Sequence, residues 1–206
     1  MTDVTICEHA SDTAIADFVE RHLAEALARC DGTVAIALPG GSTPFPILAL
    51  LATRELAWDR IVAVPTDDRL VAENHPASNT GKLRALLEPL GVDVCALDLG
   101  TTPPHFALVW LGMGADGHVA SLFPNTDPLA DDPLPVRRLT PDPLPPEAPF
   151  DRITLTIPAL VASDAVMLVI RGDDKRAVFD AAVQGEHDLP VARLLAVCDQ
   201  PVACFT

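Results

Sequence analysis

The feature that most constrains the fold of this chain is a regular alternation of short, solidly apolar segments with amphipathic ones. The apolar segments have the length and composition of buried strands, at 33–38, 61–66, 106–111, 153–157, 165–170 and 202–205. Between them lie segments with helical spacing or helix-cap residues, at 12–31, 44–53, 80–90, 158–163, 174–184 and 189–195. This alternation predicts an α/β fold, with a mostly parallel sheet and helices on both faces in a Rossmann-like layered arrangement.

The length of 206 residues predicts one domain spanning 1–206. One segment, 124–149, differs in composition because it holds nine of the twenty prolines. Proline removes a backbone donor and fixes φ, so this segment forms neither a long helix nor a central strand. Strand-like sequence resumes at Arg152, which favours a loop or lid within the domain over a linker between domains.

The net charge of −15 argues against nucleic acid or an anionic membrane as a partner, because both require a basic surface. The N-terminal segment lacks the pattern of a signal peptide, and no stretch is apolar enough to span a bilayer. The five cysteines form no C-x-x-C pair, so neither a zinc site nor a redox motif is indicated. We therefore expect a cytoplasmic protein with reduced thiols, a monomer or small homo-oligomer that binds a small molecule and holds no metal.

Ligands of open α/β sheets bind beyond the carboxyl ends of the strands, so the loops there are the first candidates for a site. The strand 33–38 is followed by Gly40, Gly41, Ser42 and Thr43, and then by a helix that begins at Pro44. Paired glycines, two hydroxyls and a helix N-terminus together favour a phosphate-binding turn. An ordinary tight turn with Thr43 as the helix cap is the alternative.

Two further loops carry polar residues. The strand 61–66 leads into Asp67, Asp68 and Arg69, which are suited to orient a sugar and a cation, although a solvated turn is equally compatible. Ser78 and Asn79 precede the next helix, where a helix cap is the simpler interpretation and sugar binding the alternative.

The stretch 112–124 is the most informative part of the sequence. Gly112, Gly114 and Gly117 surround Asp116 and His118 directly after a buried strand, where a catalytic base would be exposed to a substrate. The same glycines match the G-x-G-x-x-G pattern of dinucleotide-binding proteins. That pattern requires a helix and a second strand next, whereas the proline-rich segment follows here, so we interpret the match as accidental.

Two cations have no evident structural role in the sequence. Lys175 lies in the first turn of a predicted helix, where the helix dipole disfavours a positive charge. Arg152 stands at the start of a predicted strand. Both are candidates for a role other than structural stability, and exposure to solvent is the alternative for each.

Taken in order, these stretches resemble the 6-phosphogluconolactonase family within the wider glucosamine-6-phosphate isomerase/deaminase-like group. The resemblance rests on G-G-S-T-P at 40–44, D-D-R at 67–69, S-N at 78–79, L-G-M-G-A-D-G-H-V-A-S-L-F-P at 111–124, R-I-T-L-T at 152–156 and G-D-D-K at 172–175. Deaminase relatives have a tyrosine where Arg69 stands and a glutamate where Phe123 stands. The resemblance therefore implies a lactonase rather than a deaminase.

The resemblance further implies hydrolysis of 6-phosphogluconolactone without metal or cofactor. His118 would be the general base, with Asp116 beside it and Arg69 stabilising the oxyanion. The remaining residues implied in substrate binding are Gly40, Gly41, Ser42, Thr43, Asp67, Asn79, Gly114, Arg152 and Lys175. The alternatives are a deaminase/isomerase acting on an amino-sugar phosphate, a non-catalytic sugar-phosphate sensor and a nicotinamide-dependent oxidoreductase.

Overall fold

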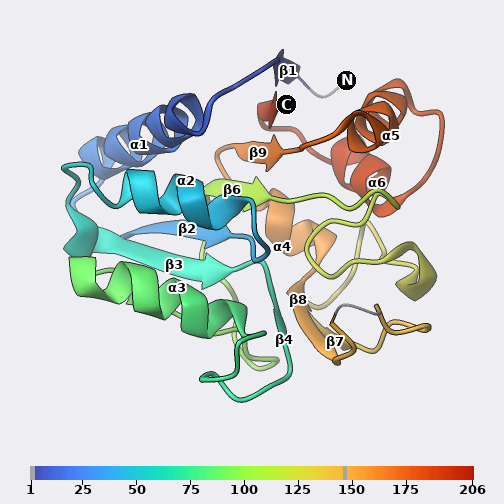
Figure 1. Cartoon of the computed structure of the whole chain (residues 1–206), viewed down its shortest axis with the longest axis horizontal. Coiled ribbons are helices and arrows are strands. Elements are labelled where there is room, and N and C mark those ends of the chain that lie inside the picture. Colours follow the sequence, from blue (N-terminus) through green and yellow to red (C-terminus); the bar gives the residue numbers. More distant parts are fainter. Residues whose placement is uncertain (1–2, 146–147) are drawn as a thin grey trace.

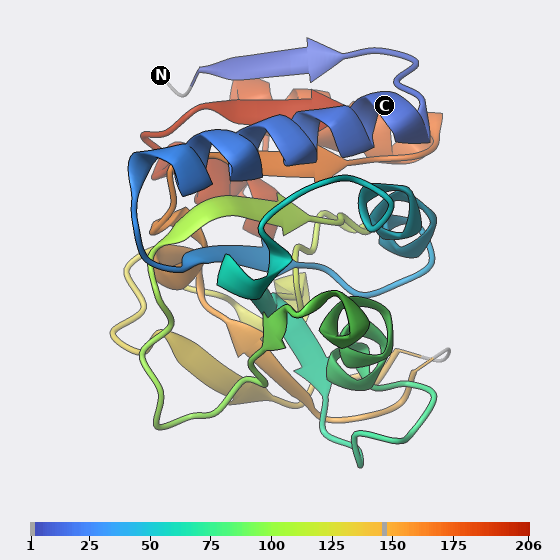
Figure 2. The ribbon, with the colours of Figure 1, turned by 90° about the vertical axis from the view of Figure 1, so that its left-hand side faces the viewer.

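The fold is built on a seven-stranded parallel sheet, seen in a computed structural model that describes residues 3–145 and 148–206. Across the sheet, the strands are β1 (Val4–Cys7), β10 (Val202–Phe205), β9 (Val166–Val169), β6 (Phe106–Leu111), β2 (Val34–Leu38), β3 (Ile61–Pro65) and β5 (Asp93–Val94). All six strand pairs are parallel, and Figure 2 shows the strands stacked side by side. The predicted parallel sheet is confirmed.

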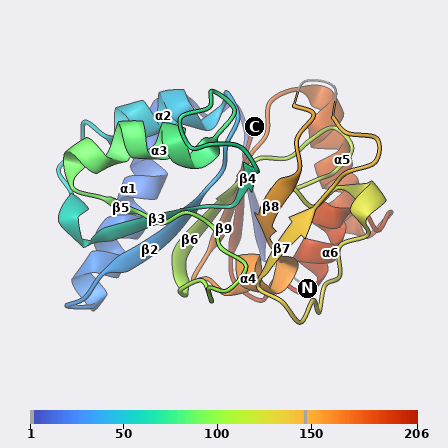
Figure 3. The same ribbon diagram turned by 90° about the horizontal axis from the view of Figure 1, so that it is seen from below.

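Helices cover both faces of this sheet, as predicted (Figures 1 and 3). One face carries α1 (Asp12–Arg29), α2 (Pro44–Leu51) and α3 (Asn79–Leu87), and the other carries α4 (Ile157–Val161), α5 (Asp173–Gln184) and α6 (Pro190–Ala196). Each helix set buries its apolar side chains in its own hydrophobic cluster, so the sheet separates two cores. Strands buried on both faces explain why their sequences are continuously apolar.

Helix α1 illustrates how the local sequence sets an element. The Ser11 side chain accepts a hydrogen bond from the Ala14 N–H at 3.2 Å, which caps the helix. Ile15, Val19 and Leu23 recur at helical spacing and are buried against the sheet. The amphipathic pattern therefore decides both the existence of the helix and the face it buries.

A second, three-stranded antiparallel sheet was not foreseen in the sequence. It consists of β4 (Asp67–Arg69), β8 (Arg152–Leu155) and β7 (Val136–Leu139), in that order. The segment expected as a strand at 153–157 is thus β8, outside the main sheet. Thr66 joins the two sheets, because its N–H donates to Leu38 O at 2.9 Å while its carbonyl accepts from Leu155 N–H at 2.9 Å. This change of partners carries β4 beyond the carboxyl edge of the main sheet.

The proline-rich segment 124–149 is not loop throughout its described part. It begins with a short 3₁₀ helix (Pro124–Thr126) and contains β7, which is an edge strand of the small sheet. Proline-flanked strands are tolerated at edges, where one side of the backbone needs no partner. Within residues 3–145 and 148–206, no helix has both the length and the apolar character needed to cross a membrane.

The strand order places a crevice at one point of the sheet. From β2 the chain builds outward through β3 and β5, and it then returns to add β6 on the opposite side of β2. The loops that follow β2 and β6 consequently diverge from adjacent strands. Ligands of open α/β sheets bind at such a reversal, so a binding site is expected between the loops after Leu38 and Leu111.

Candidate active site

A cavity of about 360 Å³ lies at the carboxyl ends of β2, β6 and β9, where β4 also borders it. It brings together stretches that are far apart in the sequence. Its lining residues are Pro39, Gly40, Gly41, Ser42, Thr43, Pro44, Asp67, Arg69, Asn79, Gly112, Met113, Gly114, His118, Ala120, Val169, Arg171 and Lys175. Ten of the twelve residues proposed from the sequence line this one cavity, and Asp116 and Arg152 do not.

The turn after β2 presents unpaired donors to the cavity. Gly41 has φ +94°, a conformation that favours glycine, and a Cβ on Gly40 would lie 2.1 Å from the Asn79 side chain. Thr43 occupies the cap position of α2, but its side chain makes no capping hydrogen bond. Within the described chain, the hydroxyls of Ser42 and Thr43 make no hydrogen bond to the protein, as an anion-binding turn requires.

Helix α2 contributes less to this turn than the sequence suggested. Pro44 and Pro46 stand in its first turn and have no N–H to offer. The donors available for an anion are therefore chiefly those of the preceding turn, from Gly41 to Thr43.

Strand β4 separates two adjacent carboxylates, because successive side chains of a strand point to opposite faces. Asp67 and Arg69 both line the cavity. The Asp67 side chain is buried and accepts a hydrogen bond from the Ser121 hydroxyl at 2.5 Å. Asp68 points away from the cavity, into the start of α3.

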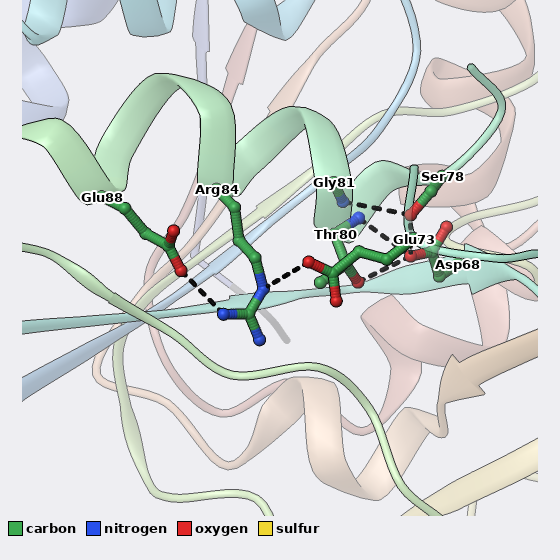
Figure 4. A network of polar contacts seen from close by, with 7 residues as sticks. All are labelled: Asp68, Glu73, Ser78, Thr80, Gly81, Arg84 and Glu88. Atoms are coloured by element: carbon green, nitrogen blue, oxygen red, sulfur yellow. Dashed lines mark hydrogen bonds and ion pairs between the residues drawn. The ribbon is translucent and has the colours of Figure 1, made fainter. Parts of the chain in front are cut away.

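The Asp68 carboxylate caps α3 by accepting several hydrogen bonds from the start of the helix (Figure 4). It accepts hydrogen bonds from the Asn79 N–H at 2.6 Å, the Thr80 N–H at 2.8 Å and the Thr80 hydroxyl at 2.6 Å. The Ser78 hydroxyl donates to it at 3.2 Å and also accepts from the Gly81 N–H at 3.0 Å. The carboxylate thus satisfies the otherwise unpaired N–H groups of a helix start.

Asn79 and Arg69 are held together at the cavity wall. The Arg69 Nη1 group donates to Asn79 Oδ1 and to Ala77 O, both at 2.9 Å. The Asn79 amide in turn donates to Asp67 O at 2.8 Å. Arg69 Nη2 has no acceptor in the described part of the chain, so this end of the guanidinium can bind a ligand. Asn79 therefore starts a helix and also orients a cation.

His118 forms a close pair with Asp116. His118 Nδ1 lies 2.6 Å from Asp116 Oδ1, which also accepts from the His118 backbone N–H at 3.3 Å. The hydrogen bond from His118 lowers the pKa of Asp116 below its usual value, so this carboxylate is ionised at neutral pH. Across residues 3–145 and 148–206, Nε2 has no partner, and the ring lines the cavity. Asp116 lies behind the imidazole.

The glycines of this loop serve the histidine rather than a dinucleotide. A Cβ on Gly114 would lie 2.3 Å from the His118 ring, so only glycine lets the imidazole lie there. After Gly117 the chain forms bridges from Met113 to Val119 and from Val119 to Leu122 instead of a helix. The helix that a dinucleotide-binding G-x-G-x-x-G requires after its last glycine does not follow here.

Two cations face the cavity from the loop after β9. Lys175 is half-buried in the first turn of α5 and has no hydrogen-bond or ion-pair partner in the described chain. Arg171 also lines the cavity, held by Asp12 Oδ1 at 3.1 Å and Ala10 O at 3.2 Å. Sequence reasoning did not assign Arg171 to the site. Its position directly after the strand 165–170 was the signal available.

Arg152 lies in the interior near the cavity rather than in its lining. Its guanidinium donates to Phe150 O at 2.9 Å and to Ala148 O at 2.8 Å. It stands opposite Arg69 in the β4–β8 register, and burial together with Arg69 lowers its pKa. Its hydrogen bonds tie the end of the proline-rich segment to β8, while direct contact with a ligand stays a prediction.

The lining of the cavity carries a net positive charge, although the protein as a whole is acidic. Arg69, Arg171 and Lys175 line it against a single carboxylate, that of Asp67, in a chain of net charge −15. Such a site attracts an anion that the rest of the surface repels. Over residues 3–145 and 148–206, no cluster of three or more His, Cys, Asp or Glu side chains is arranged to hold a metal ion.

Comparisons with known proteins agree on one family. The family model described as glucosamine-6-phosphate isomerases/6-phosphogluconolactonase matches residues 8–99 and 92–202. The 6-phosphogluconolactonase of Mesorhizobium japonicum is 34% identical over 212 residues, covering 93% of this chain and 87% of the relative. That of Pseudomonas aeruginosa is 34% identical over 200 residues, covering 86% and 83%.

Solved structures share the fold over the full chain. A 6-phosphogluconolactonase from Shewanella baltica has a TM-score of 0.82 at 25% identity, covering 100% of this chain and 97% of the other. One from Thermotoga maritima has a TM-score of 0.83 at 23% identity and covers 100% of both chains. The arrangement of strands and helices is therefore that of these structures.

Proposed function

The chain belongs to the family of glucosamine-6-phosphate isomerases and 6-phosphogluconolactonases, and we propose from this premise and from its cavity that it hydrolyses 6-phosphogluconolactone to 6-phosphogluconate. The observation that carries the proposal is the His118–Asp116 pair, at 2.6 Å, whose imidazole lines the same cavity as Lys175 and the turn at Gly41. That combination suits water activation beside a phosphorylated substrate.

The His118–Asp116 pair determines which nitrogen acts. An ionised carboxylate only accepts hydrogen bonds, so the neutral imidazole carries its proton on Nδ1, facing Asp116. Nε2 then holds the free lone pair. This nitrogen is the general base in the proposed reaction, and Asp116 keeps the ring in that tautomer.

The proposed reaction consists of two proton transfers and one exchange of bonds. His118 Nε2 takes a proton from water as the water oxygen bonds to the lactone carbonyl carbon, and the negative charge develops on the carbonyl oxygen. Arg69 stabilises this oxyanion with its unpaired Nη2 group. The ring C–O bond then breaks, and the departing oxygen takes the proton back from His118. Asp67 and Asn79 border the same space and bind sugar hydroxyls.

The phosphate of the substrate is assigned to the turn and the loop cations. The unpaired donors of Gly41, Ser42 and Thr43 meet an anion from one side, and Lys175 and Arg171 supply positive charge. Of the two cations, Arg171 already has Asp12 as a partner, whereas Lys175 has none in the described chain. Lys175 is thus the cation most available to the phosphate.

Replacing Lys175 by alanine is expected to raise KM for the phosphorylated lactone roughly 10- to 100-fold, which corresponds to the loss of one charge-assisted hydrogen bond. The kcat value should change little, because the ammonium contacts the phosphate in both ground and transition states. Steady-state kinetics with unphosphorylated glucono-1,5-lactone provide the comparison, since that substrate should not respond to the change. Lys82→Ala, on the exposed face of α3, is the control. An unchanged KM in Lys175→Ala would contradict the phosphate assignment.

The proposed function itself is tested by following the lactone directly. Glucose-6-phosphate is oxidised in place to generate the lactone, and its decay is measured with and without the protein. We expect decay faster than the spontaneous hydrolysis. Decay at the spontaneous rate, with thermal stabilisation of the protein by the sugar phosphate, would instead support a non-catalytic sensor.

No observation favours deamination of an amino-sugar phosphate. The resemblance assigns a glutamate of that reaction to the position of Phe123, whose ring lies against His118 at 4.5 Å between centroids. Ammonia release from glucosamine-6-phosphate is the assay for that activity, and we expect none.

The surroundings of the protein remain predictions from the sequence. We infer that it works in the cytoplasm as a monomer or small homo-oligomer, with a phosphorylated sugar lactone as its partner and neither nucleic acid nor membrane. The net charge of −15 and the five free cysteines support this inference.

A further inference from the structure

Phe123 is set apart from most phenylalanines of this chain by its surroundings. Five of the seven phenylalanines are in or packed against the two hydrophobic clusters: Phe18, Phe45, Phe106, Phe179 and Phe205. Phe123 is half-buried and belongs to neither cluster. Its ring contact in the described chain is with His118, at 4.5 Å between centroids and 37° between planes.

The Phe123 backbone is held firmly at this point. Its carbonyl accepts hydrogen bonds from the Thr126 N–H at 3.0 Å and from the Thr126 hydroxyl at 2.8 Å. The residue also forms the N-cap position of the short helix 124–126. Because the backbone is fixed, the Phe123 ring extends from a fixed point and can restrain the ring that it touches.

Three neighbours together restrict the His118 imidazole. Asp116 binds Nδ1, and the Gly114 backbone lies so close that a Cβ there would be 2.3 Å from Nδ1 and Cε1. Phe123 packs against the ring at a centroid separation of 4.5 Å, at the short end of the range for aromatic pairs. Phe123 does not line the cavity, so it contacts the imidazole from outside the space where substrate would bind.

We propose that Phe123 is a positioning residue, which holds the imidazole of His118 so that Nε2 stays directed at the reacting water. The hydrogen bond to Asp116 fixes one atom of the ring but leaves the imidazole free to tilt about that contact. The Phe123 ring removes this freedom. This inference rests on the proposed function for its kinetic consequence, while the restraint on the ring can be observed without any substrate.

Phe123→Leu is the first test, because leucine keeps an apolar side chain and removes the flat ring. We expect kcat to fall about two- to tenfold, the factor that corresponds to the stabilisation of one aromatic pair. KM should be unchanged, since Phe123 lies outside the cavity lining. Phe123→Tyr, which keeps the aromatic face, should retain near-wild-type kcat. Should Phe123→Leu fail to fold, Phe123→Met provides the same comparison.

Phe150→Leu is a matched control. Phe150 is also half-buried, lies outside both hydrophobic clusters and contacts a histidine ring, that of His75, at 5.4 Å. Neither residue lines the cavity. The same substitution there should leave kcat unchanged, so a general loss of stability would affect both variants while loss of positioning would affect only Phe123→Leu.

Nuclear magnetic resonance of the histidine ring nitrogens gives the readout that does not depend on activity. In the unmodified protein we expect one sharp set of His118 ring signals with the proton on Nδ1, and in Phe123→Leu shifted or broadened signals from a ring that tilts about the Asp116 contact. Unchanged ring signals and unchanged kcat in Phe123→Leu would overturn the positioning role. Absence of lactonase activity in the unmodified protein would overturn the proposed function, and the ring signals would still decide the restraint.

Discussion

Replacing His118 by alanine is expected to lower kcat for 6-phosphogluconolactone by about 10²- to 10⁴-fold, the usual contribution of a general base. The physical reason is the loss of Nε2, the nitrogen without a protein partner in the described chain, from a residue that lines the cavity. KM should stay within roughly threefold, because the phosphate and hydroxyl contacts are retained and only a transition-state interaction is removed.

The control for this prediction is His105→Ala. His105 forms a similar pair, with its Nε2 2.8 Å from Asp164 Oδ1, but it is exposed and far from the cavity lining. It should retain full turnover. Added imidazole should partly restore turnover in His118→Ala, in proportion to the concentration of its unprotonated form. Near-wild-type kcat in His118→Ala would remove the general base from the mechanism.

Replacing Asp68 by asparagine is expected to lower the free energy of unfolding by about 2–4 kcal/mol, since buried hydrogen bonds to a charged group are lost. The Asp68 side chain is 6% exposed and accepts hydrogen bonds from the backbone of Arg69, Asn79 and Thr80. An amide offers one acceptor oxygen, and its NH₂ group would face N–H donors. The negative charge that complements the start of α3 also disappears.

Urea unfolding monitored by circular dichroism measures this effect. Asp17→Asn is the control, because Asp17 pairs with Arg54 on the surface and its side chain is 56% exposed. It should change the free energy of unfolding by no more than about 0.5 kcal/mol. Equal midpoints for Asp68→Asn and the unmodified protein would show that the network in Figure 4 contributes little to stability.

Two carboxylates stand behind these predictions, Asp116 as the partner of His118 and Asp68 itself, and their roles differ through their surroundings. Asp116 is half-exposed behind an imidazole, and its pKa is lowered by that contact. Asp68 is buried under a helix start and does not itself line the cavity, but it binds the backbone N–H groups of Asn79 and Arg69, which do. Loss of Asp68 should therefore weaken substrate binding only through the displacement of these two residues.

Much of the fold follows from local sequence. The strands β6 and β10 occupy the predicted ranges 106–111 and 202–205, because an uninterrupted apolar run is stable only when buried on both faces. Helix α1 begins at Asp12, the predicted start of the segment 12–31, because capping by Ser11 is a contact between near neighbours. The short strands β1, β4 and β5 were not foreseen, since their sequences (V-T-I-C, D-D-R and D-V) contain polar residues and form no continuous apolar run.

The sequence by itself determined that Gly41, Asp116 and His118 follow buried strands of a parallel sheet, because apolar periodicity and glycine placement are local properties. Only the tertiary structure decided which neighbouring residues face the cavity. Asp67 lines it while Asp68 caps α3, and Arg171 lines it while Arg152 binds the backbone of the proline-rich segment. The physical reason is that strand pairing at Thr66 sets which side of β4 faces the crevice, and such long-range hydrogen bonds leave no trace in the local sequence.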